Sequence, residues 1–433
     1  MRVLISAFSC EPGKGSEPEV GLRTVLAAAT RHEVWVLTDD IGAPALQRFL
    51  DGHPLGARVH LEPIPLGIDL NARVHLEPIP LGIDLNGLGL ISFHRYYDRW
   101  QRRASSRALA LDRQIGFDLV HHATISTVWT RVGVASVPKP LVWGPVGGGV
   151  ETPVHLLPEL GFRGLLDDML RVASRRLLAR LPATRRAPRT AAVVLAQNHE
   201  TERRLRAQGD VIILPNATAV EVGAVAPIGQ RAPEVALVGR IVGWKGGHLA
   251  MRAFRHVTHP GAILRVYGAG PDRARLERTA HRWGLANRVR FEGWIPRSAL
   301  LPRIARAGVL LHPSFHDDAP LCVAEALSFG TPVVCLDHGG PAEVVRRWPT
   351  SPSHLVPPAG ANVSARRMAE AIDAFLLRPP PIRKAPAQAA PPFGEMLLDA
   401  YAAASHGPTV SADGERRLYR QEDRRRAGGL TAE

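Results

Sequence analysis

Residues 2–38 read RVLISAFSCEPGKGSEPEVGLRTVLAAATRHEVWVLT, and the order of apolar and loop-forming stretches within them decides the fold class. The apolar run RVLISAF predicts a buried strand, and CEPGKGSEPEVG predicts a loop because proline and glycine interrupt regular structure. GLRTVLAAAT then predicts a helix, and EVWVLT predicts a second strand. A helix between two strands at this spacing is typical of a parallel α/β sheet covered by helices on both faces.

The same alternation continues along the chain. Further apolar strand candidates lie at 117–122, 140–143, 192–196, 211–214, 234–239, 262–267, 308–312 and 332–336. We therefore expect two doubly wound domains, one over residues 1–208 and one over residues 209–391. A short amphipathic helix over 392–405 is expected to pack back on the first domain, and the charged segment 406–433 is expected to be disordered.

The composition is that of a folded protein, since 45% of the 433 residues are hydrophobic and 22% are charged. No stretch approaches the roughly 18 consecutive apolar residues of a membrane-spanning helix. The short apolar run at the N-terminus is better explained as a strand than as a signal peptide. The three cysteines lack the spacing of a zinc site or a disulfide framework, so we expect a cytoplasmic protein without a structural metal.

The net charge of +14 is concentrated in two segments. Residues 94–113 carry six Arg and two Asp, and residues 163–189 carry eight Arg and two Asp. A basic surface of this kind suits nucleic acid, an anionic membrane or a phosphorylated substrate. We expect no nucleic-acid partner, because the segments lack interleaved aromatic residues and any named nucleic-acid motif.

One of these basic segments predicts an amphipathic helix over residues 164–181. One face of this helix is apolar, formed by Leu166, Met169, Leu170, Ala173 and Leu177. Arg171 and Arg175 lie on the opposite face. Two interpretations remain open: the apolar face packs into the core beneath a solvated arginine face, or the helix is a peripheral contact with an anionic membrane that carries lipid-linked acceptors.

The most specific motif is HDDAPLCVAEALSFGTPVVCL, residues 316–336. Asp317 and Asp318 follow a strand, and a helix that contains Glu325 is expected to begin near Pro320. The amides at such a helix start face the crevice at the carboxyl ends of the strands, where they form an anion site suited to phosphate. The alternative is that the two aspartates only cap the helix while Glu325 lies on a solvated helix face.

A second motif, VALVGRIVGWKGGHLAMRAF, covers residues 235–254. It places Arg240 at the end of a strand and Lys245 five residues later, before a glycine pair and a helix. Two cations beside a glycine-rich turn can offset the charge that develops on a diphosphate leaving group without a metal ion. A solvated surface loop is the alternative for the Arg and Lys taken alone.

With these motifs the sequence resembles the retaining nucleotide-sugar glycosyltransferases of family 4, the glycosyl transferases group 1. The resemblance rests on the Arg240/Lys245 pair and on Asp317 and Glu325, which are eight residues apart. Supporting segments are LPNA (214–217), RVYGAGPDRARLE (265–277), VRFEGWIP (289–296), GGPAEVV (339–345) and, more loosely, WGPVGGG and AQNHETE in the first half. The resemblance implies a GT-B fold, in which two Rossmann-like domains face a central cleft and the second domain binds the nucleotide sugar.

The resemblance also implies roles for residues of the second domain. Arg240 and Lys245 would hold the diphosphate, and Glu325 would bind the ribose hydroxyls. Asp317 would contact the hydroxyls of the sugar, although the family usually has Glu there, so that Asp318 stays open as the residue that reaches the sugar. The other expected donor-binding residues are Gly239, Pro320, Leu321 and Cys322.

In the first domain, Gly15 matches the glycine loop that lies near the phosphates and the acceptor in such enzymes. The family also tends to carry a histidine that contacts the transferred sugar. His121 and His122 lie in the matching region, but an ungapped match places Ala123 at the expected position. Each histidine therefore has two interpretations, a sugar contact or a ring whose hydrogen bonds are satisfied at a strand end.

The function implied is the retaining transfer of a sugar from a nucleoside-diphosphate sugar to a hydroxyl acceptor on a polysaccharide, a glycolipid or a small metabolite. No metal and no cofactor are expected, and the sequence has no Asp-x-Asp metal motif. Two alternatives stay open: an epimerase or hydrolase of nucleotide sugars with the same fold, and a nucleotide-sugar-binding protein without turnover. A nicotinamide dehydrogenase is disfavoured, because GAGPDR (268–273) lacks the last glycine of the dinucleotide fingerprint.

One feature has no expected function. Residues 57–71, ARVHLEPIPLGIDLN, recur without change as residues 72–86. Structural repeats are longer and need three or more units, so a recent duplication explains the pair better. We expect one copy to form the third strand and the other to be a loop insertion, because loops tolerate extra length at low entropic cost.

Overall fold

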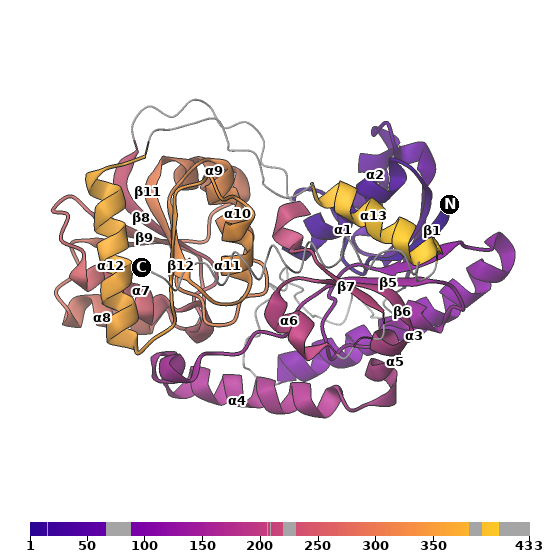
Figure 1. Ribbon diagram of the computed structural model, residues 1–433, viewed down its shortest axis with the longest axis horizontal. Helices are drawn as coiled ribbons and strands as arrows, with labels where there is room; N and C mark the ends of the chain where they lie inside the picture. The colour runs from indigo at the N-terminus through magenta and orange to yellow at the C-terminus, as the bar shows by residue number, and fades with distance from the viewer. Residues whose placement is uncertain are drawn as a thin grey trace, which may run out of the picture.

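The computed structural model contains two parallel β-sheets, each flanked by helices, in two domains that lie side by side (Figure 1). The residues that the structure describes are 1–14, 16–65, 88–205, 207, 209–219, 231–380 and 392–406. Gly15, most of the tail predicted over 406–433 and all of the second repeat copy lie outside the described residues. The two doubly wound sheets expected from the sequence are confirmed.

The first sheet has seven strands in the order β3-β2-β1-β4-β5-β6-β7. Its strands are β1 (Arg2–Ser6), β2 (Glu33–Asp39), β3 (Val59–Ile64), β4 (Leu119–His122), β5 (Leu141–Val146), β6 (Ala191–Ala196) and β7 (Asp210–Ile213). The accompanying helices are α1 (Ser16–Ala29), α2 (Ala43–Asp51), α3 (Leu88–Ile115), α4 (Gly161–Leu178), α5 (Pro182–Thr190) and α6 (His199–Arg204).

The second sheet has six strands in the order β10-β9-β8-β11-β12-β13. Its strands are β8 (Ala232–Val238), β9 (Ile263–Tyr267), β10 (Val289–Gly293), β11 (Ala307–His312), β12 (Val333–Leu336) and β13 (Ser353–Val356). The helices of this domain are α7 (Gly247–His256), α8 (Arg273–Arg282), α9 (Arg297–Arg306), α10 (Leu321–Ser328), α11 (Gly339–Arg346) and α12 (Ala361–Leu377), and the chain continues to α13 (Phe393–His406).

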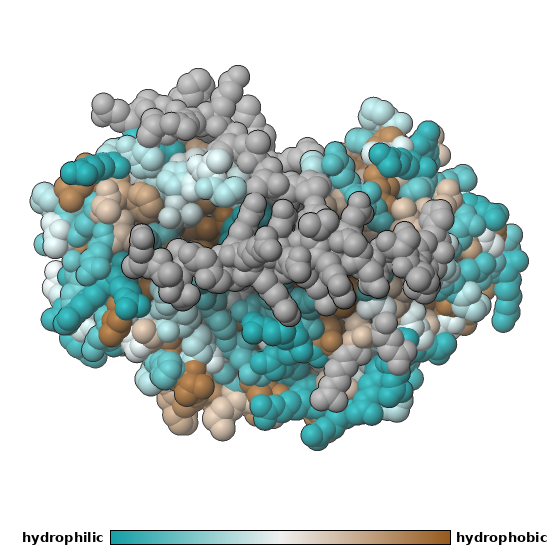
Figure 2. Space-filling view, in the orientation of Figure 1, coloured by the Kyte–Doolittle hydropathy of each residue, from teal (hydrophilic) through white to brown (hydrophobic). Residues whose placement is uncertain are grey.

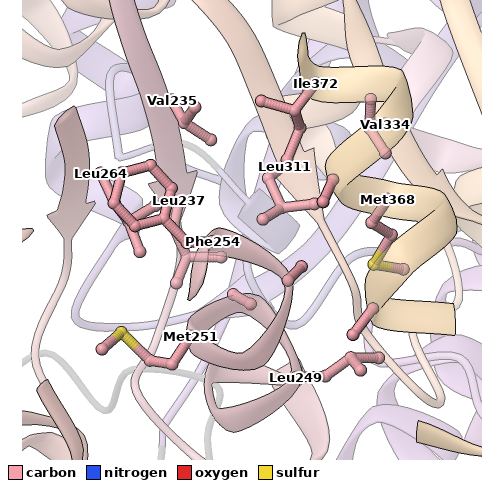
Figure 3. Close-up of a cluster of buried hydrophobic side chains, with 14 of the residues drawn as sticks. Val235, Leu237, Leu249, Met251, Phe254, Leu264, Leu311, Val334, Met368 and Ile372 are labelled. Carbon is pink, nitrogen blue, oxygen red and sulfur yellow. The ribbon is translucent and has the colours of Figure 1, made fainter. Parts of the chain in front are cut away.

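Most strands are rich in apolar residues because helices cover both faces of each sheet. In the second domain, Leu237 and Leu264 of the sheet pack against Phe254 of α7 (Figure 3). Met368 of α12 closes the same cluster beside Leu311 of β11 (Figure 3). This core fixes the strand ends from which the candidate site is built.

The expected domain boundary is wrong at one strand. The boundary expected after residue 208 places the apolar segment 211–214 in the second domain, but β7 pairs in parallel with β6 and is the last strand of the first sheet. The second sheet begins only at Ala232. The physical reason is that an apolar run predicts a buried strand but does not specify the strand with which it pairs.

The last described helix, α13, packs on the first domain, where 392–405 was expected to pack (Figure 1). Leu397 and Tyr401 of α13 are fully buried in the same cluster as Val25 of α1. The chain thus crosses back from the second domain before it reaches its end, and the two domains are linked more than once.

Helix α4 is turned the opposite way from the interpretation in which its apolar face packs into the core. Arg175 is buried, forms an ion pair with Glu151 and donates to the Gly148 carbonyl oxygen at 2.8 Å. Met169 and Leu177 on the other face are exposed (Figure 1 places α4 at the lower edge). That interpretation is therefore wrong: the partly exposed Glu151 carboxylate and the Gly148 carbonyl oxygen hold Arg175 on the inner side of α4, which leaves the apolar face in solvent.

Helix length and hydropathy also bear on the membrane. Across the ranges given above, no helix is both long and apolar enough to cross a bilayer.

Candidate functional site

The residues of the second motif surround a pocket at the carboxyl end of β8. The pocket is lined by Gly239, Arg240, Lys245 and His312, together with apolar side chains of β8, β9 and α8. In doubly wound sheets, ligands bind at the carboxyl ends of the strands. The structure therefore brings together the predicted cation pair at the place where the fold class expects a ligand.

Two glycines shape the turn that carries the cations. Gly239 has a φ of +141°, a conformation that other residues rarely adopt. Gly246 has a φ of +72°, and an added Cβ there would lie 2.1 Å from the Pro313 carbonyl oxygen. Only glycine allows this close approach of the turn to the end of β11, and the approach brings Lys245 next to Asp317.

Lys245 forms an ion pair with Asp317, whose Oδ2 also accepts a hydrogen bond from His312 Nε2 at 3.0 Å. Burial by itself raises the pKa of Asp317, but the charge of Lys245 and the His312 hydrogen bond hold this pKa well below its usual range. Burial lowers the pKa of His312, so its ring is neutral near pH 7. The result is an oriented carboxylate, 13% exposed, beside an ammonium group that is 21% exposed.

Cys322 extends this network. Its Sγ lies 3.6 Å from His312 Nδ1, and burial raises the pKa of the thiol to about 12. A neutral ring that donates from Nε2 to Asp317 presents Nδ1 as an acceptor, so the protonated thiol can donate to it. Cys322 therefore supports the ring that orients Asp317, and its high pKa makes it a poor nucleophile.

Asp318 points away from this pocket and toward the first domain. Its Oδ2 accepts a hydrogen bond from the Gly148 amide at 2.8 Å, and Asn198 Nδ2 donates to its carbonyl oxygen at 3.0 Å. Burial, followed by the charge of Asp317, raises the pKa of Asp318. The two neighbouring aspartates thus contact different parts of the molecule, and Asp317 is the one that pairs with Lys245.

The helix-cap interpretation of this motif is wrong. α10 begins at Leu321 with Pro320 as its N-cap, and no side chain caps it. The amides at the helix start are therefore not taken by Asp317 or Asp318. Gly330, with a φ of +65°, follows the helix as expected for a C-terminal glycine.

Glu325 is buried inside α10 and is 4% exposed, so the alternative of a solvated helix face is wrong. Its Oε1 accepts a hydrogen bond from Arg297 Nε at 2.8 Å. Burial raises the pKa of Glu325, and the charge of Arg297 opposes that shift. The ion pair orients the carboxylate from α9, an element in which no sequence motif marks a site residue.

The structure favours the structural interpretation of both candidate histidines. His121 Nε2 lies 2.7 Å from the Gly144 carbonyl oxygen, and its Nδ1 lies 2.7 Å from the Tyr401 hydroxyl. His122 Nδ1 lies 3.3 Å from Ser6 Oγ, and its Nε2 lies 3.3 Å from the Tyr97 hydroxyl. Both rings are fully buried with all four nitrogens engaged, so the role of sugar contact predicted for them is not supported.

Two residues after Gly15, the structure shows a carboxylate, that of Glu17, which no sequence motif marks as a site residue. Glu17 Oε2 accepts a hydrogen bond from the Ile125 amide at 3.0 Å. Ile125 has a φ of +53°, which costs a β-branched residue roughly 1–3 kcal/mol. Glu17 thus holds the loop after β4 in a strained conformation at the face of the first domain that meets the second.

Other functional groups come from segments without a sequence signal. His312 closes β11 five residues before Asp317, and nothing in the motif marked it. Asn198 lies in AQNHETE, where its side chain also caps α6 by accepting from the Thr201 amide at 2.8 Å. In the part of the chain that the structure describes, no group of three or more His, Cys, Asp and Glu side chains is arranged to hold a metal ion.

One protein-family model matches the second domain. Residues 224–391 match the model described as "Glycosyl transferases group 1". This stretch contains the turn of Arg240 and Lys245 and the motif of Asp317 and Glu325.

Curated relatives match over part of their length. The chain is 31% identical to a 2-deoxystreptamine glucosyltransferase of Streptomyces kanamyceticus over 146 residues, which is 33% of this chain and 37% of the relative. It is 34% identical to the lipopolysaccharide core biosynthesis glycosyltransferase LpsE of Rhizobium meliloti over 115 residues, which is 27% of this chain and 33% of the relative. The matches thus span about a third of the relatives' own length.

Solved structures match over almost the whole chain. The lipopolysaccharide outer core galactosyltransferase WaaB aligns with a TM-score of 0.54 at 13% identity, over 93% of this chain and 99% of that one. A sucrose-phosphate synthase from Thermosynechococcus elongatus aligns with a TM-score of 0.50 at 17% identity, over 97% of this chain and 98% of that one. At this identity the likeness concerns the fold, and it places both domains in the GT-B class.

Proposed function

Residues 224–391 are a glycosyl transferases group 1 domain, and from that premise we propose that the chain transfers a sugar from a nucleoside-diphosphate sugar to a hydroxyl acceptor. The observation that carries the proposal is the pocket at the end of β8, which Arg240 and Lys245 line, with the oriented carboxylate of Asp317 paired to Lys245. Two cations in a pocket with an acidic group next to one of them suit a substrate that joins a diphosphate to a sugar.

Lys245 is the group best placed to stabilise the leaving diphosphate. An ammonium group has three N–H donors, and its ion pair with Asp317 uses one of them. The remaining donors can contact phosphate oxygens, and the charge offsets the negative charge that develops as the sugar–phosphate bond breaks. Glu325, held by Arg297, is assigned to the ribose hydroxyls on the same proposal.

We assign a retaining course to the transfer, with the leaving phosphate accepting the proton of the acceptor hydroxyl. The support is the state of Asp317, whose pKa lies well below its usual range because of Lys245 and His312. A carboxylate with so low a pKa is a weak general base. Its role is then to bind the hydroxyls of the sugar, and the reaction does not require a metal ion.

The acceptor is proposed to be a hydroxyl of a polysaccharide, a glycolipid or a small metabolite. Relatives named for 2-deoxystreptamine and for the lipopolysaccharide core represent two of these classes. The first domain would hold the acceptor, with the strained loop at Ile125 and the Gly148 loop facing the second domain.

The experiment begins with thermal-shift measurements against a panel of nucleoside diphosphates and their sugars, because a ligand at 100 times its Kd stabilises by about 2.7 kcal/mol. The donor that stabilises the protein is then incubated with and without a mixture of hydroxyl acceptors. Acceptor-dependent release of nucleoside diphosphate, with the donor's anomeric configuration kept in the product, is the expected result.

Each alternative function has its own outcome. Consumption of donor in the absence of acceptor would replace the proposal with an epimerase or a hydrolase. Binding without any turnover across the acceptor panel would replace it with a nucleotide-sugar-binding protein. Inversion at the anomeric carbon would overturn the retaining course alone.

A further inference from the structure

Helix α4 exposes a continuous apolar stripe. Phe162 is 83% exposed, Met169 is 61% exposed and Leu177 is 65% exposed. These residues and their exposed neighbours Leu166 and Leu170 follow the spacing i, i+4, i+7, i+8 and i+15, which places them on one face of a helix. Seven of the twelve large hydrophobic side chains that the described part of the chain exposes lie between residues 154 and 181, so the stripe is a concentrated surface.

The stripe faces outward because the opposite side of α4 is tied down by polar contacts. Besides the buried Arg175, Arg171 donates to Asp168 at 2.8 Å, and Thr152 donates to the same carboxylate at 3.1 Å. His316 of the second domain lies 3.5 Å from Asp168. A rotation of α4 that buried its leucines would separate these charged groups from their partners. The polar contacts therefore fix the orientation of the helix.

The surroundings of the stripe are positively charged. Six arginines of α4, α5 and the turn between them are exposed: Arg163, Arg176, Arg180, Arg185, Arg186 and Arg189. The acidic residues between 154 and 190 are Glu159 and Asp168, which are buried and ion-paired, and the partly buried Asp167. Figure 2 shows the combination at the lower edge of the molecule, where brown apolar side chains adjoin teal ones along the position of α4.

This pattern selects among the surfaces that can cover the stripe. A second copy of the chain would bring an identical arginine-rich surface against it across a two-fold axis, and like charges oppose such a contact. An anionic bilayer offers hydrocarbon to the stripe and phosphate groups to the flanking arginines. We propose that α4 and the start of α5 dock this protein on the surface of an anionic lipid bilayer.

The side of α4 opposite the stripe adjoins the candidate site. A methyl group added at Gly164 of α4 would contact Gly243 of the pocket turn at 3.6 Å, and the Asp168–His316 pair joins α4 to the residue before Asp317. A membrane against the stripe would therefore be separated from the turn of Lys245 by α4 alone. Docking itself does not depend on the proposed transfer reaction.

The test is flotation of the purified full chain with vesicles, without donor or acceptor. One set of vesicles contains equal parts of phosphatidylglycerol and phosphatidylcholine, and the other contains phosphatidylcholine alone. The wild-type chain is expected to float with the anionic vesicles at low salt, to dissociate as the salt concentration rises, and to float weakly or not at all with the neutral vesicles.

Two variants separate the apolar and the charged contributions. The first replaces the stripe with glutamine (Leu166→Gln, Met169→Gln, Leu170→Gln and Leu177→Gln) and is expected to lower partitioning at least about tenfold. The second (Arg176→Gln, Arg180→Gln and Arg185→Gln) is expected to lower it about fivefold for each arginine. Because these side chains are exposed, the melting temperature should stay unchanged in both.

Matched controls lie on α12 of the second domain. Leu377 is 66% exposed, and Arg366, Arg367 and Arg378 are exposed as well. The variants Leu377→Gln and the triple Arg→Gln at these positions should float like the wild type. The proposal is overturned if the wild-type chain does not float with anionic vesicles, or if the α12 variants lose as much binding as the α4 variants. A wild-type chain that does not bind vesicles but forms a dimer, which the glutamine substitutions in the stripe dissociate, would replace the membrane with a second copy of the chain.

Discussion

At the scale of single residues, Lys245 and Asp317 show how one contact sets two properties. The ion pair keeps Asp317 charged and weakly basic, and it leaves Lys245 partly exposed to the pocket. The carboxylate of Asp318, one residue later, instead accepts a hydrogen bond from the backbone amide of Gly148 in the first domain. Substitutions at these neighbouring positions should therefore have different consequences.

Lys245→Ala is expected to lower the turnover of the proposed transfer about 100-fold or more with donor saturating, the usual cost of losing one electrostatic contact to the transition state. Circular dichroism and the melting temperature check that the variant is folded. Lys139→Ala is the matched control, since Lys139 pairs with Asp112 in the first domain and lies far from the pocket in the fold. Near wild-type turnover of Lys245→Ala would remove the lysine from the site.

Asp317 and Glu325 are expected to affect different steps. Asp317→Ala should keep the affinity for the bare nucleoside diphosphate and lose transfer. Glu325→Gln should weaken binding of the diphosphate and the intact donor alike, by about tenfold, because a charged hydrogen-bond acceptor contributes roughly 1.5–3 kcal/mol. Calorimetric affinities and turnover separate these outcomes.

Asp318→Ala is the internal control for that pair, and it should reduce transfer less than Asp317→Ala because its carboxylate contacts the Gly148 backbone. If Asp318→Ala alone abolished transfer, the assignment of the sugar contact would move by one residue.

At the scale of elements, β3 shows how two identical segments are told apart only by position. β3 comes from the first copy of the repeat and pairs with β2, with Val59 opposite Val34. Deleting either copy produces the same amino-acid sequence, so a deletion cannot identify the strand. Point substitutions at matching positions can.

Val59→Asp is expected to destabilise the protein by more than about 2 kcal/mol, because it places an unpaired charge among buried apolar side chains. Val74→Asp, the same substitution in the second copy, is expected to change stability by less than about 0.5 kcal/mol. Urea unfolding of both variants checks this. Equal losses would show that both copies are structural.

At the scale of the whole molecule, α13 fastens the end of the chain to the first domain through a hydrogen bond between residues 280 positions apart. Tyr401 of α13 lies 2.7 Å from His121 Nδ1. Burial lowers the pKa of His121 to about 4, with the Gly144 carbonyl opposing the shift. The His121 ring is thus kept neutral, because charging it would place a charge in a fully buried site.

The sign of the resulting pH dependence follows from these values. The folded pKa of about 4 lies below the unfolded value of about 6.5, so the unfolded chain binds more protons between these values. Stability should therefore fall as the pH falls from about 6.5 to about 4, by at most about 1.4 kcal/mol per pH unit from this ring.

Melting temperatures between pH 7.5 and pH 4.5 measure that decline. His121→Gln should make the decline shallower without abolishing it, because burial also lowers the pKa of His122 to about 3. His256→Gln, at an exposed position, should leave the decline unchanged. An identical decline in His121→Gln and the wild type would exclude His121 as its source.

The sequence by itself determined the alternation of strands and helices, the glycine turn between Gly239 and Gly246, and the cation and carboxylate motifs. Such features are local, because hydropathy period, glycine conformation and motif spacing act within a few residues of one another. They were enough to predict two doubly wound sheets and the strand ends at which Lys245 and Asp317 meet.

Only the tertiary structure decided which side of each local feature faces inward. The amphipathic pattern of α4 is the same whether its leucines or its arginines are buried. Contacts of Arg175 with Glu151 and with the Gly148 carbonyl oxygen, both outside the helix, decide which face is buried. The pairing of β7 with β6 and the engagement of His121 by Tyr401 were decided in the same way. A buried polar group needs a hydrogen-bond or ion-pair partner, and the fold supplies that partner from a segment that a local sequence pattern does not include.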